Sequence, residues 1–391
     1  MLCIRIAVYD VKIAIMVKKS NQHYVPRFYF NFFSTDKKTI CVLNRKNGAT
    51  YKLAPIKSQA SKNYFYGNET IEDALSNLEG HFSTVLRQLN ESNSFDKFES
   101  DNLLLLLQNI MLQRSRTVTS RNNKAEFYDL ITEYELEVFI NNDQTLSDEE
   151  KEVLRKEQKN IRANPKPHQL MEMKINVELA NHLSDLMPII LLNRTNRPFI
   201  FGDAPVIFIN PYQKRIKFCG VLGAKASGLL IYYPISPSRA VLLVDSYIYK
   251  VKKLINSVVK LTQFSDIANL NKLQIHNAAN TVYFSEYKYA DYVSELWRQE
   301  RNALSNDRGA VVEAPGVDQS GNGIGDIIHT FEHQLPLIPK FSFLQHSEVN
   351  ECTHALLRDN FFLNKQSRSD LTQYLEKLLC KINPNRLSNI N

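Results

Sequence analysis

Three residues that are able to do chemistry lie close together near the start of the chain: Gln22, His23 and Arg27. His23 is followed by a Val-Pro pair and a run of aromatic residues, which must be at least half-buried, and Pro26 keeps the residue before it extended. A histidine held in this way can act as a general base or bind a metal ion. The alternative is a buried histidine that hydrogen-bonds to the backbone.

A second group of polar residues forms one stripe on a helix, predicted from about residue 99, that is otherwise apolar nearly all round. Spacings of seven, four and three residues place the four side chains within about 60° of one another: Asn102, Asn109, Gln113 and Arg116. The stripe faces either solvent or an internal polar site. If Arg116 is buried, it needs a carboxylate or a bound anion as its partner.

Asp203 lies in a predicted turn between two strands, where an aspartate either caps the backbone or supplies a carboxylate for metal binding or general-base chemistry. Glu79 and His81 lie on a helix predicted over residues 70–92. We predict that the catalytic residues are His23, Asp203 and Glu79, and that Arg27, Gln113 and Arg116 bind the substrate. If the fold brings them together, they suit a phosphoesterase or nuclease that acts on nucleic acid or a nucleotide, with a divalent metal as the candidate cofactor.

The distribution of charge supports a non-enzymatic alternative, a regulatory module that binds an anion or a partner through Arg116 and a basic N-terminal region. Residues 1–60 contain eleven Lys or Arg against Asp10 and Asp36, a net of +9, whereas the whole chain carries +7. A basic region attracts polyanions such as nucleic acid. An ordinary solvated surface is the other interpretation.

A third possibility is zinc peptidase chemistry near the C-terminus. His329, Glu332 and His333 have the His-x-x-Glu-His form of inverted zinc peptidases, on a short helix predicted over residues 326–335, with Glu348 and Glu351 as the nearest downstream carboxylates. The pattern by itself favours two exposed histidines.

The composition is that of an ordinary globular chain of 391 residues. Five cysteines lie far apart without a Cys-x-x-Cys pair, which argues against a disulfide framework. No apolar stretch reaches 18 residues, so we expect a cytoplasmic protein without a membrane anchor. Residues 3–17 fit a strand, and Met16 is an alternative start.

The pattern of apolar and turn residues predicts an α+β fold, in which a helical layer packs on a mostly antiparallel sheet, with an N-terminal β-hairpin and a helical C-terminal extension. We expect an extension over 1–19, one domain over 20–300 and a loop-rich extension over 301–391. The hairpin is expected at 39–53 around Asn47-Gly48, and strand pairs at 198–209 and 229–245. Helices are expected at 70–92, 99–140 with a kink, 147–161, 168–192, 264–302 and 368–382, and a linker at 303–326.

Residues 21–33 (NQHYVPRFYFNFF) resemble the opening signature of domain of unknown function family 4238, in which a Gln-His-x-Val-Pro run precedes an aromatic-rich stretch. Other matching segments follow in the family's order: 61–67, Glu79, Gln113 with Arg116 and Thr117, 199–206, 234–237 and 271–285. The resemblance covers roughly residues 20–290 and implies a bacterial, uncharacterised family with no settled activity. The chain departs from the family pattern at Phe201, Gly202 and Ala204, where the family has Thr, Ser and Asn.

Overall fold

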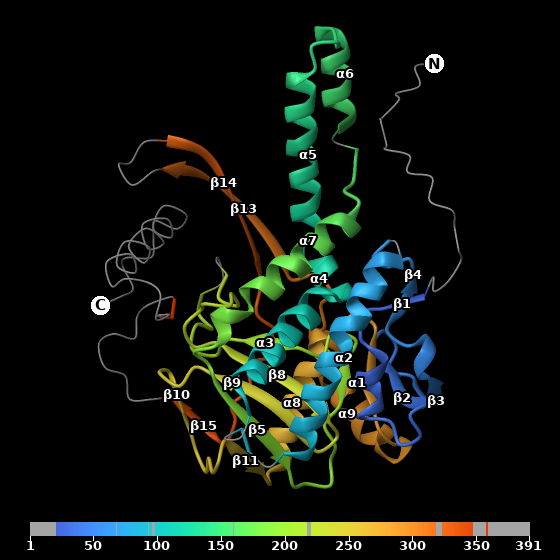
Figure 1. Ribbon diagram of the computed structural model, residues 1–391, viewed down its shortest axis with the longest axis vertical. Helices are drawn as coiled ribbons and strands as arrows, with labels where there is room; N and C mark the ends of the chain where they lie inside the picture. The colour runs from blue at the N-terminus through green and yellow to red at the C-terminus, as the bar shows by residue number, and fades with distance from the viewer. Residues whose placement is uncertain are drawn as a thin grey trace.

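The computed structural model describes residues 21–67, 69–92, 94–95, 98–158, 160–216, 220–317, 323–346 and 357–358. The strand expected at 3–17 and the helix expected at 368–382 lie outside these residues. Within them the fold is α+β, as predicted, with helices α1 (Arg27–Asn31), α2 (Glu69–Glu91), α3 (Ser100–Ser115), α4 (Val118–Asn123), α5 (Ala125–Asn142), α6 (Asp148–Gln158), α7 (Pro165–Glu178), α8 (Phe264–Asn277) and α9 (Ala290–Glu300) (Figure 1).

Two sheets form the body of the molecule. The larger has the strand order β11-β5-β9-β8-β7 and is antiparallel except for its β11–β5 pair. Its strands are β11 (Val258–Leu261), β5 (Met187–Asn193), β9 (Arg239–Val244), β8 (Leu230–Ser236) and β7 (Ile207–Ile209). The smaller sheet, β3-β2-β12-β6, is antiparallel and contains β3 (Thr50–Pro55), β2 (Thr39–Asn44), β12 (Thr281–Phe284) and β6 (Phe201–Gly202). The prediction of a mostly antiparallel arrangement is therefore confirmed.

The five-stranded sheet is buried on both faces, which explains why its strands are apolar almost without interruption. Side chains alternate along each strand, so Ile190 packs with α2 and α3, while Ile189 and Leu191 pack with α8 on the opposite face. A third cluster joins α8 and α9 to the smaller sheet. Helix α8 is thus central, and the loops at its ends can reach both sheets.

The smaller elements extend this body. Short antiparallel pairs join β1 (Asn21–His23) to β4 (Ser61–Asn63), and β10 (Tyr249–Val251) to β15 (Leu344–His346). A long hairpin is formed by β13 (Gly309–Val317) and β14 (Gly323–Glu332). Figure 1 shows that helices α5 and α6 project from the body and that the β13–β14 hairpin projects on the side away from β2 and β3.

The N-terminal hairpin agrees with its prediction in both strands and turn. Strands β2 and β3 flank Asn47-Gly48, and Gly48 has φ +74°. A Cβ atom at this position would lie 2.3 Å from Cζ3 of Trp297 on α9, so both the backbone angle and the packing require glycine.

Two predicted helices were too long. The segment expected as a helix over 168–192 is helix α7, a 3-10 helix at Leu179–Leu183 and then strand β5. The segment expected as a helix over 264–302 is interrupted by β12. Short apolar runs fit a buried strand as well as a helix, and the sheet pairing available to these segments decides between the two.

The expected linker over 303–326 and the expected helix over 326–335 were also wrong, because most of this region is the β13–β14 hairpin. Its β-branched residues Val311, Val312, Ile327 and Ile328 lie in directly paired stretches of the two strands. β-branched residues favour strands, and their packing against cross-strand neighbours stabilises the hairpin.

Candidate functional site

Arg116, at the C-terminal end of α3, is only 2% exposed and contacts three protein groups. Its Nη1 lies 2.8 Å from Oε1 of Glu79, Nη2 donates to the carbonyl oxygen of His23 at 2.7 Å, and Nε donates to the hydroxyl of Tyr66 at 3.2 Å. Burial alone would lower the pKa of Arg116, but Tyr66 and Glu79 raise it above its ordinary value. Three of the predicted site residues therefore meet, and Glu79 is the carboxylate that a buried Arg116 requires.

Two more residues of the polar stripe on α3 also face the interior, whereas Asn102 is only partly buried. The Nε2 of Gln113 donates to the carbonyl oxygen of Tyr24 at 2.9 Å, and the backbone N–H of Tyr66 donates to Oε1 of Gln22 at 2.7 Å. Asn109 is buried as well. These contacts attach the N-terminal strand and its aromatic segment to the central helix. Their observed role is to stabilise the fold.

His23 is held as a neutral imidazole. Burial, together with the positive charges of Arg27 and Arg116, lowers its pKa to about 4, although hydrogen bonds with the backbone of Lys57 and Ile56 act in the opposite direction. Its Nε2 atom is buried and has no hydrogen-bond partner among the described residues. Arg27 itself is exposed. The catalytic role of His23 and the substrate-binding role of Arg27 stay predictions.

Asp203, between β6 and β7, is buried and holds the turn that follows α8. Its Oδ1 accepts the backbone N–H of Ala279 at 2.7 Å, its Oδ2 accepts that of Asn280 at 3.0 Å, and its own N–H donates to Thr281. Burial raises the pKa of Asp203, and these hydrogen bonds oppose the increase. In the described part of the chain no hydrogen bond or ion pair joins Asp203 to Arg116, Glu79 or His23, so its observed contacts are those of a backbone cap.

His329, Glu332 and His333 do not form the helical zinc motif that their spacing suggested. His329 and Glu332 lie on strand β14, where residues 329 and 332 point to opposite faces and residue 333 follows the strand end. Within the described residues, no group of three or more His, Cys, Asp or Glu side chains is placed to hold a metal ion. Glu348 and Glu351 lie outside those residues.

A cleft of about 350 Å³ opens between α3, α4, α7 and the end of β14. This volume is within the range of small-molecule sites. The walls combine charged and polar groups with apolar side chains, and they are formed by Met111, Arg114, Ser115, Ser120, Asn123, Lys124, Glu172, Asn176, Leu179, Phe208, Gly220, Leu222, Gly223, Ala224, Thr330, Phe331 and Glu332.

Arg114 lines this cleft on the other side of α3 from Arg116, because residues two positions apart on a helix point about 200° away from each other. Its guanidinium lies 3.7 Å over the ring of Phe208, donates to the carbonyl oxygen of Leu222 at 3.1 Å, and pairs with Glu332 at 3.2 Å. A guanidinium has five N–H donors, so donors beyond these contacts remain for a ligand.

Glu332 lies between two arginines. Its Oε1 is 2.6 Å from Nη2 of Arg308, and its Oε2 contacts Arg114. Burial raises the pKa of Glu332, but the two positive charges more than offset that effect and lower it, so the carboxylate is ionised at neutral pH. One negative charge thus faces two positive charges at this end of the cleft.

Lys124 also lines the cleft. It pairs with Glu172 at 2.5 Å, and its side chain is 33% exposed. The Oε2 of Glu172 also accepts the hydroxyl of Tyr128 at 2.7 Å. Arg114 and Lys124 thus line the cleft together with two carboxylates, Glu172 and Glu332. Arg308 is buried beside Glu332 and is not part of the lining, and it adds a third positive charge close by.

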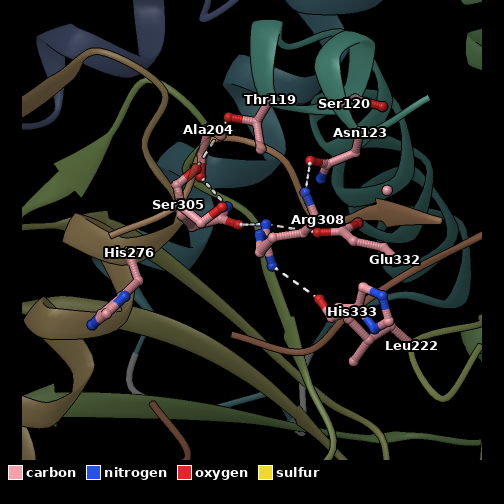
Figure 2. A network of polar contacts seen from close by, with 12 residues as sticks. Thr119, Ser120, Asn123, Ala204, Leu222, His276, Ser305, Arg308, Glu332 and His333 are labelled. Atoms are coloured by element: carbon pink, nitrogen blue, oxygen red, sulfur yellow. Dashed lines mark hydrogen bonds and ion pairs between the residues drawn. The ribbon is translucent and has the colours of Figure 1, made fainter. Parts of the chain in front are cut away.

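Asn123 supplies an uncharged donor to the same cleft. Its Oδ1 accepts the backbone N–H of Arg308 at 3.1 Å, while its buried Nδ2 has no partner within the described part of the chain. Figure 2 shows Asn123 beside Arg308, with Glu332 and His333 on the other sides of the arginine. An unpaired N–H costs about 1–3 kcal/mol when it is kept from water, so this amide favours a ligand with an acceptor oxygen.

The Arg308 side chain also ties the hairpin to the body of the molecule. Its Nη2 donates to Oδ1 of Asn277 at 2.8 Å, and Asn277 in turn donates to the carbonyl oxygen of Ala204 at 2.7 Å. The position of Glu332 in the cleft thus depends on the turn that contains Asp203 and on the end of α8.

Residues 21–288 match the model of a family described as protein of unknown function (DUF4238). The chain belongs to the DUF4238 family. No curated protein and no solved structure matches it.

The DUF4238 motif residues lie mainly in the interior. The opening signature forms β1 and α1, whose aromatic rings pack with Phe201 and Tyr283, and the Gln-x-x-Arg pattern supplies Gln113 and Arg116. At Gly202, where the resemblance predicts serine, a Cβ atom would lie 2.8 Å from Cβ of Ala278. In this DUF4238 protein, the absence of a side chain at Gly202 therefore allows β6 to approach the end of α8 closely.

Sequence reasoning missed Arg114, Lys124, Asn123 and Arg308. The stripe on α3 led to Arg116, whereas the cleft uses the neighbouring arginine on another face. Its walls come from segments that lie more than 200 residues apart in the sequence, such as those of Arg114 and Glu332. No local pattern predicts that such distant segments come together. A charged residue on an apolar central helix does indicate a polar partner, and this signal applied to Arg114 as well as to Arg116.

Proposed function

We propose that this DUF4238 protein binds a small phosphate-bearing molecule of about nucleotide size in the cleft lined by Arg114, Lys124 and Asn123. The observation that carries the proposal is the set of donors that line the cleft: the guanidinium of Arg114, the ammonium of Lys124 and the Nδ2 of Asn123, which has no partner within the described residues. Guanidinium, ammonium and amide groups are the donors that proteins use for phosphate oxygens. This is the anion-binding alternative of the sequence analysis, at a different arginine.

The apolar part of the cleft supports a ligand with a ring or other non-polar portion. Phe208, Leu222, Phe331 and Met111 line it together with the polar groups. Binding pockets for small molecules typically combine an apolar wall with a few placed polar groups. Nucleotides have both features, because a planar base is attached to a charged phosphate.

Isothermal titration calorimetry with ATP, AMP and inorganic pyrophosphate tests the proposal. Asn123→Asp is the sharpest variant, since it keeps an oxygen acceptor for the N–H of Arg308 but replaces the free donor by a negative charge. We expect binding to weaken at least tenfold, because losing one charge-assisted hydrogen bond costs about 1.5–3 kcal/mol. Unchanged affinity in Asn123→Asp would contradict the proposed site.

A second test compares a variant of the cleft, Lys124→Ala, with a matched control, Lys288→Ala. Lys124→Ala removes a lysine that pairs with Glu172, and Lys288→Ala removes an exposed lysine that pairs with Glu286 at 2.8 Å. We expect only Lys124→Ala to weaken ATP or pyrophosphate binding. Equal effects of the two would point to a general effect of net charge.

The hydrolase prediction is tested in the same series. The full chain is incubated with ATP in the presence of MgCl₂ or MnCl₂, and release of phosphate is measured. Binding without turnover supports a binding module. Turnover that disappears in Asn123→Asp would extend the proposal to catalysis in the cleft.

A further inference from the structure

A strongly basic surface surrounds strands β1 to β4, on the side of the molecule away from the β13–β14 hairpin (Figure 1). Residues 21–67 contain eight Lys or Arg and a single acidic residue, Asp36. Of the eight cations, Arg45 is buried, and the other seven are exposed: Arg27, Lys37, Lys38, Lys46, Lys52, Lys57 and Lys62. We call these seven residues the basic surface.

The seven residues of the basic surface have no acidic partners. Across the described residues, no ion pair joins any of the seven to a carboxylate, whereas some exposed cations elsewhere, such as Lys288 and Arg298, are paired with glutamates. Asp36 accepts the backbone N–H groups of Lys38 and Thr39 and so serves as a turn cap. The positive charges are therefore not neutralised by neighbouring side chains.

Backbone contacts bring several of these cations together from separate strands. The N–H of Ile56 donates to the carbonyl oxygen of Lys38 at 2.9 Å, and the side chain of Asn21 donates to the carbonyl oxygen of Lys57 at 3.0 Å. Lys62 pairs with Gln22 across β4 and β1. These contacts place the segments that contain Lys38, Lys57 and Lys62 next to one another.

Exposed aromatic residues accompany the charge. Tyr51, on the edge strand β3, is 53% exposed, and Tyr64, just after β4, is 51% exposed. Proteins that bind single-stranded nucleic acid combine a basic surface for the phosphates with aromatic side chains on which bases stack. Anionic membranes are usually met by an amphipathic helix, and this surface is built from short strands.

We propose that the basic surface binds single-stranded nucleic acid, with Lys38, Lys57 and Lys62 contacting the phosphates and Tyr51 stacking on a base. This site is separate from the cleft and does not depend on the function proposed there. Phosphate recognition is common to RNA and DNA, so both are tested.

Fluorescence anisotropy with labelled 20-nucleotide RNA and DNA of the same sequence, titrated with the full chain at several salt concentrations, tests the proposal. The triple variant Lys38→Glu, Lys57→Glu, Lys62→Glu is compared with Lys174→Glu, Lys250→Glu, Lys260→Glu. The control triple has the same charge change at exposed lysines of α7, β10 and β11. All six side chains are exposed, so both variants should fold, which circular dichroism verifies.

We expect the triple variant of the basic surface to bind at least tenfold more weakly than the wild type. Its slope of log affinity against log salt should fall by about 2, since each phosphate contact contributes about 0.7 for single strands. Tyr51→Ala should weaken binding of the single strand more than binding of a duplex. Equal loss in the control triple, or binding to phosphatidylserine vesicles but not to either oligonucleotide, would overturn the proposal.

Discussion

Replacing Arg116 by alanine should lower the free energy of unfolding by about 3 kcal/mol. The guanidinium is 2% exposed and satisfies Glu79, the carbonyl oxygen of His23 and the hydroxyl of Tyr66. Breaking a buried ion pair costs about 3–5 kcal/mol, and a buried acceptor left unpaired costs about 1–3 kcal/mol. The loss lies at the lower end, because Glu79 is 23% exposed and can be hydrated, and Tyr66 keeps its hydrogen bond to the backbone of residue 116.

Equilibrium unfolding in urea, followed by circular dichroism, measures this loss. Arg155→Ala is the matched control, because Arg155 pairs with Glu137 at 3.1 Å while both side chains are 36% exposed, and such pairs contribute less than about 1 kcal/mol. If Arg116→Ala lost no more stability than Arg155→Ala, with the same denaturant dependence, the guanidinium would not be the structural hub that its contacts indicate. A role in substrate binding would then become the better interpretation.

Three other predictions follow from single residues. The pKa of His23 is about 4 in the folded chain and 6.5 ordinarily, so the unfolded chain takes up the proton first, and stability present above pH 6.5 is lost as the pH falls towards 4. In urea unfolding, the loss of stability between pH 8 and pH 5 should be about 2 kcal/mol smaller in His23→Gln than in the wild type, from about 1.4 kcal/mol for each unit of pKa shift. Asp203→Ala should lower the free energy of unfolding by about 2–4 kcal/mol, because the alanine leaves the N–H groups of Ala279 and Asn280 unpaired. Asp203→Asn should cost less, and a larger loss in the asparagine variant would contradict the capping role. Gly48→Ala should cost about 2 kcal/mol or more and shift the fluorescence of Trp297, the single tryptophan of the chain, and an unchanged melting temperature would refute this packing argument.

The parts of the fold that the sequence predicted well are those with local signals. The β2–β3 hairpin was predicted from Asn47-Gly48, and helix α6 from its position after Ser147, whose hydroxyl caps the helix with Glu150. The strands β8 and β9 follow from two apolar runs around a proline-containing connection. In these cases the residues that determine the structure are neighbours in the chain.

Strands β5 and β12 were predicted as helix because their partners are distant in sequence, whereas β14, whose C-terminal part was also predicted as helix, pairs with the preceding strand β13. Strand β12 pairs with β2, more than 200 residues earlier, and β14 becomes a strand through its register with β13. A short apolar run has no intrinsic preference strong enough to decide between helix and strand. The described helices also include none that is long and apolar enough to cross a bilayer.

At the candidate site, the structure shows the partners of the predicted residues, and their catalytic and substrate-binding roles stay predictions. A buried arginine at 116 required a carboxylate, and Glu79, already singled out, proved to be its partner. The cleft required knowing that α3 is central and that each of its faces meets a different segment, which no spacing on α3 alone reveals.

Helix α3 connects the buried contacts of Arg116 to the cleft. Arg116 and Gln113 face the N-terminal strand and fix the helix against it, while Arg114 faces the cleft and contacts Glu332 of the hairpin. Because these residues lie within one turn of the same helix, we expect the loss of the interior contacts of Arg116 to displace the guanidinium of Arg114 as well. A variant that weakens the Arg116 hub without unfolding the chain, such as Glu79→Gln, should therefore weaken ATP binding in the cleft even though Glu79 does not line it. Retention of full ATP affinity in a Glu79→Gln protein with reduced stability would demonstrate that the two faces of the helix act independently.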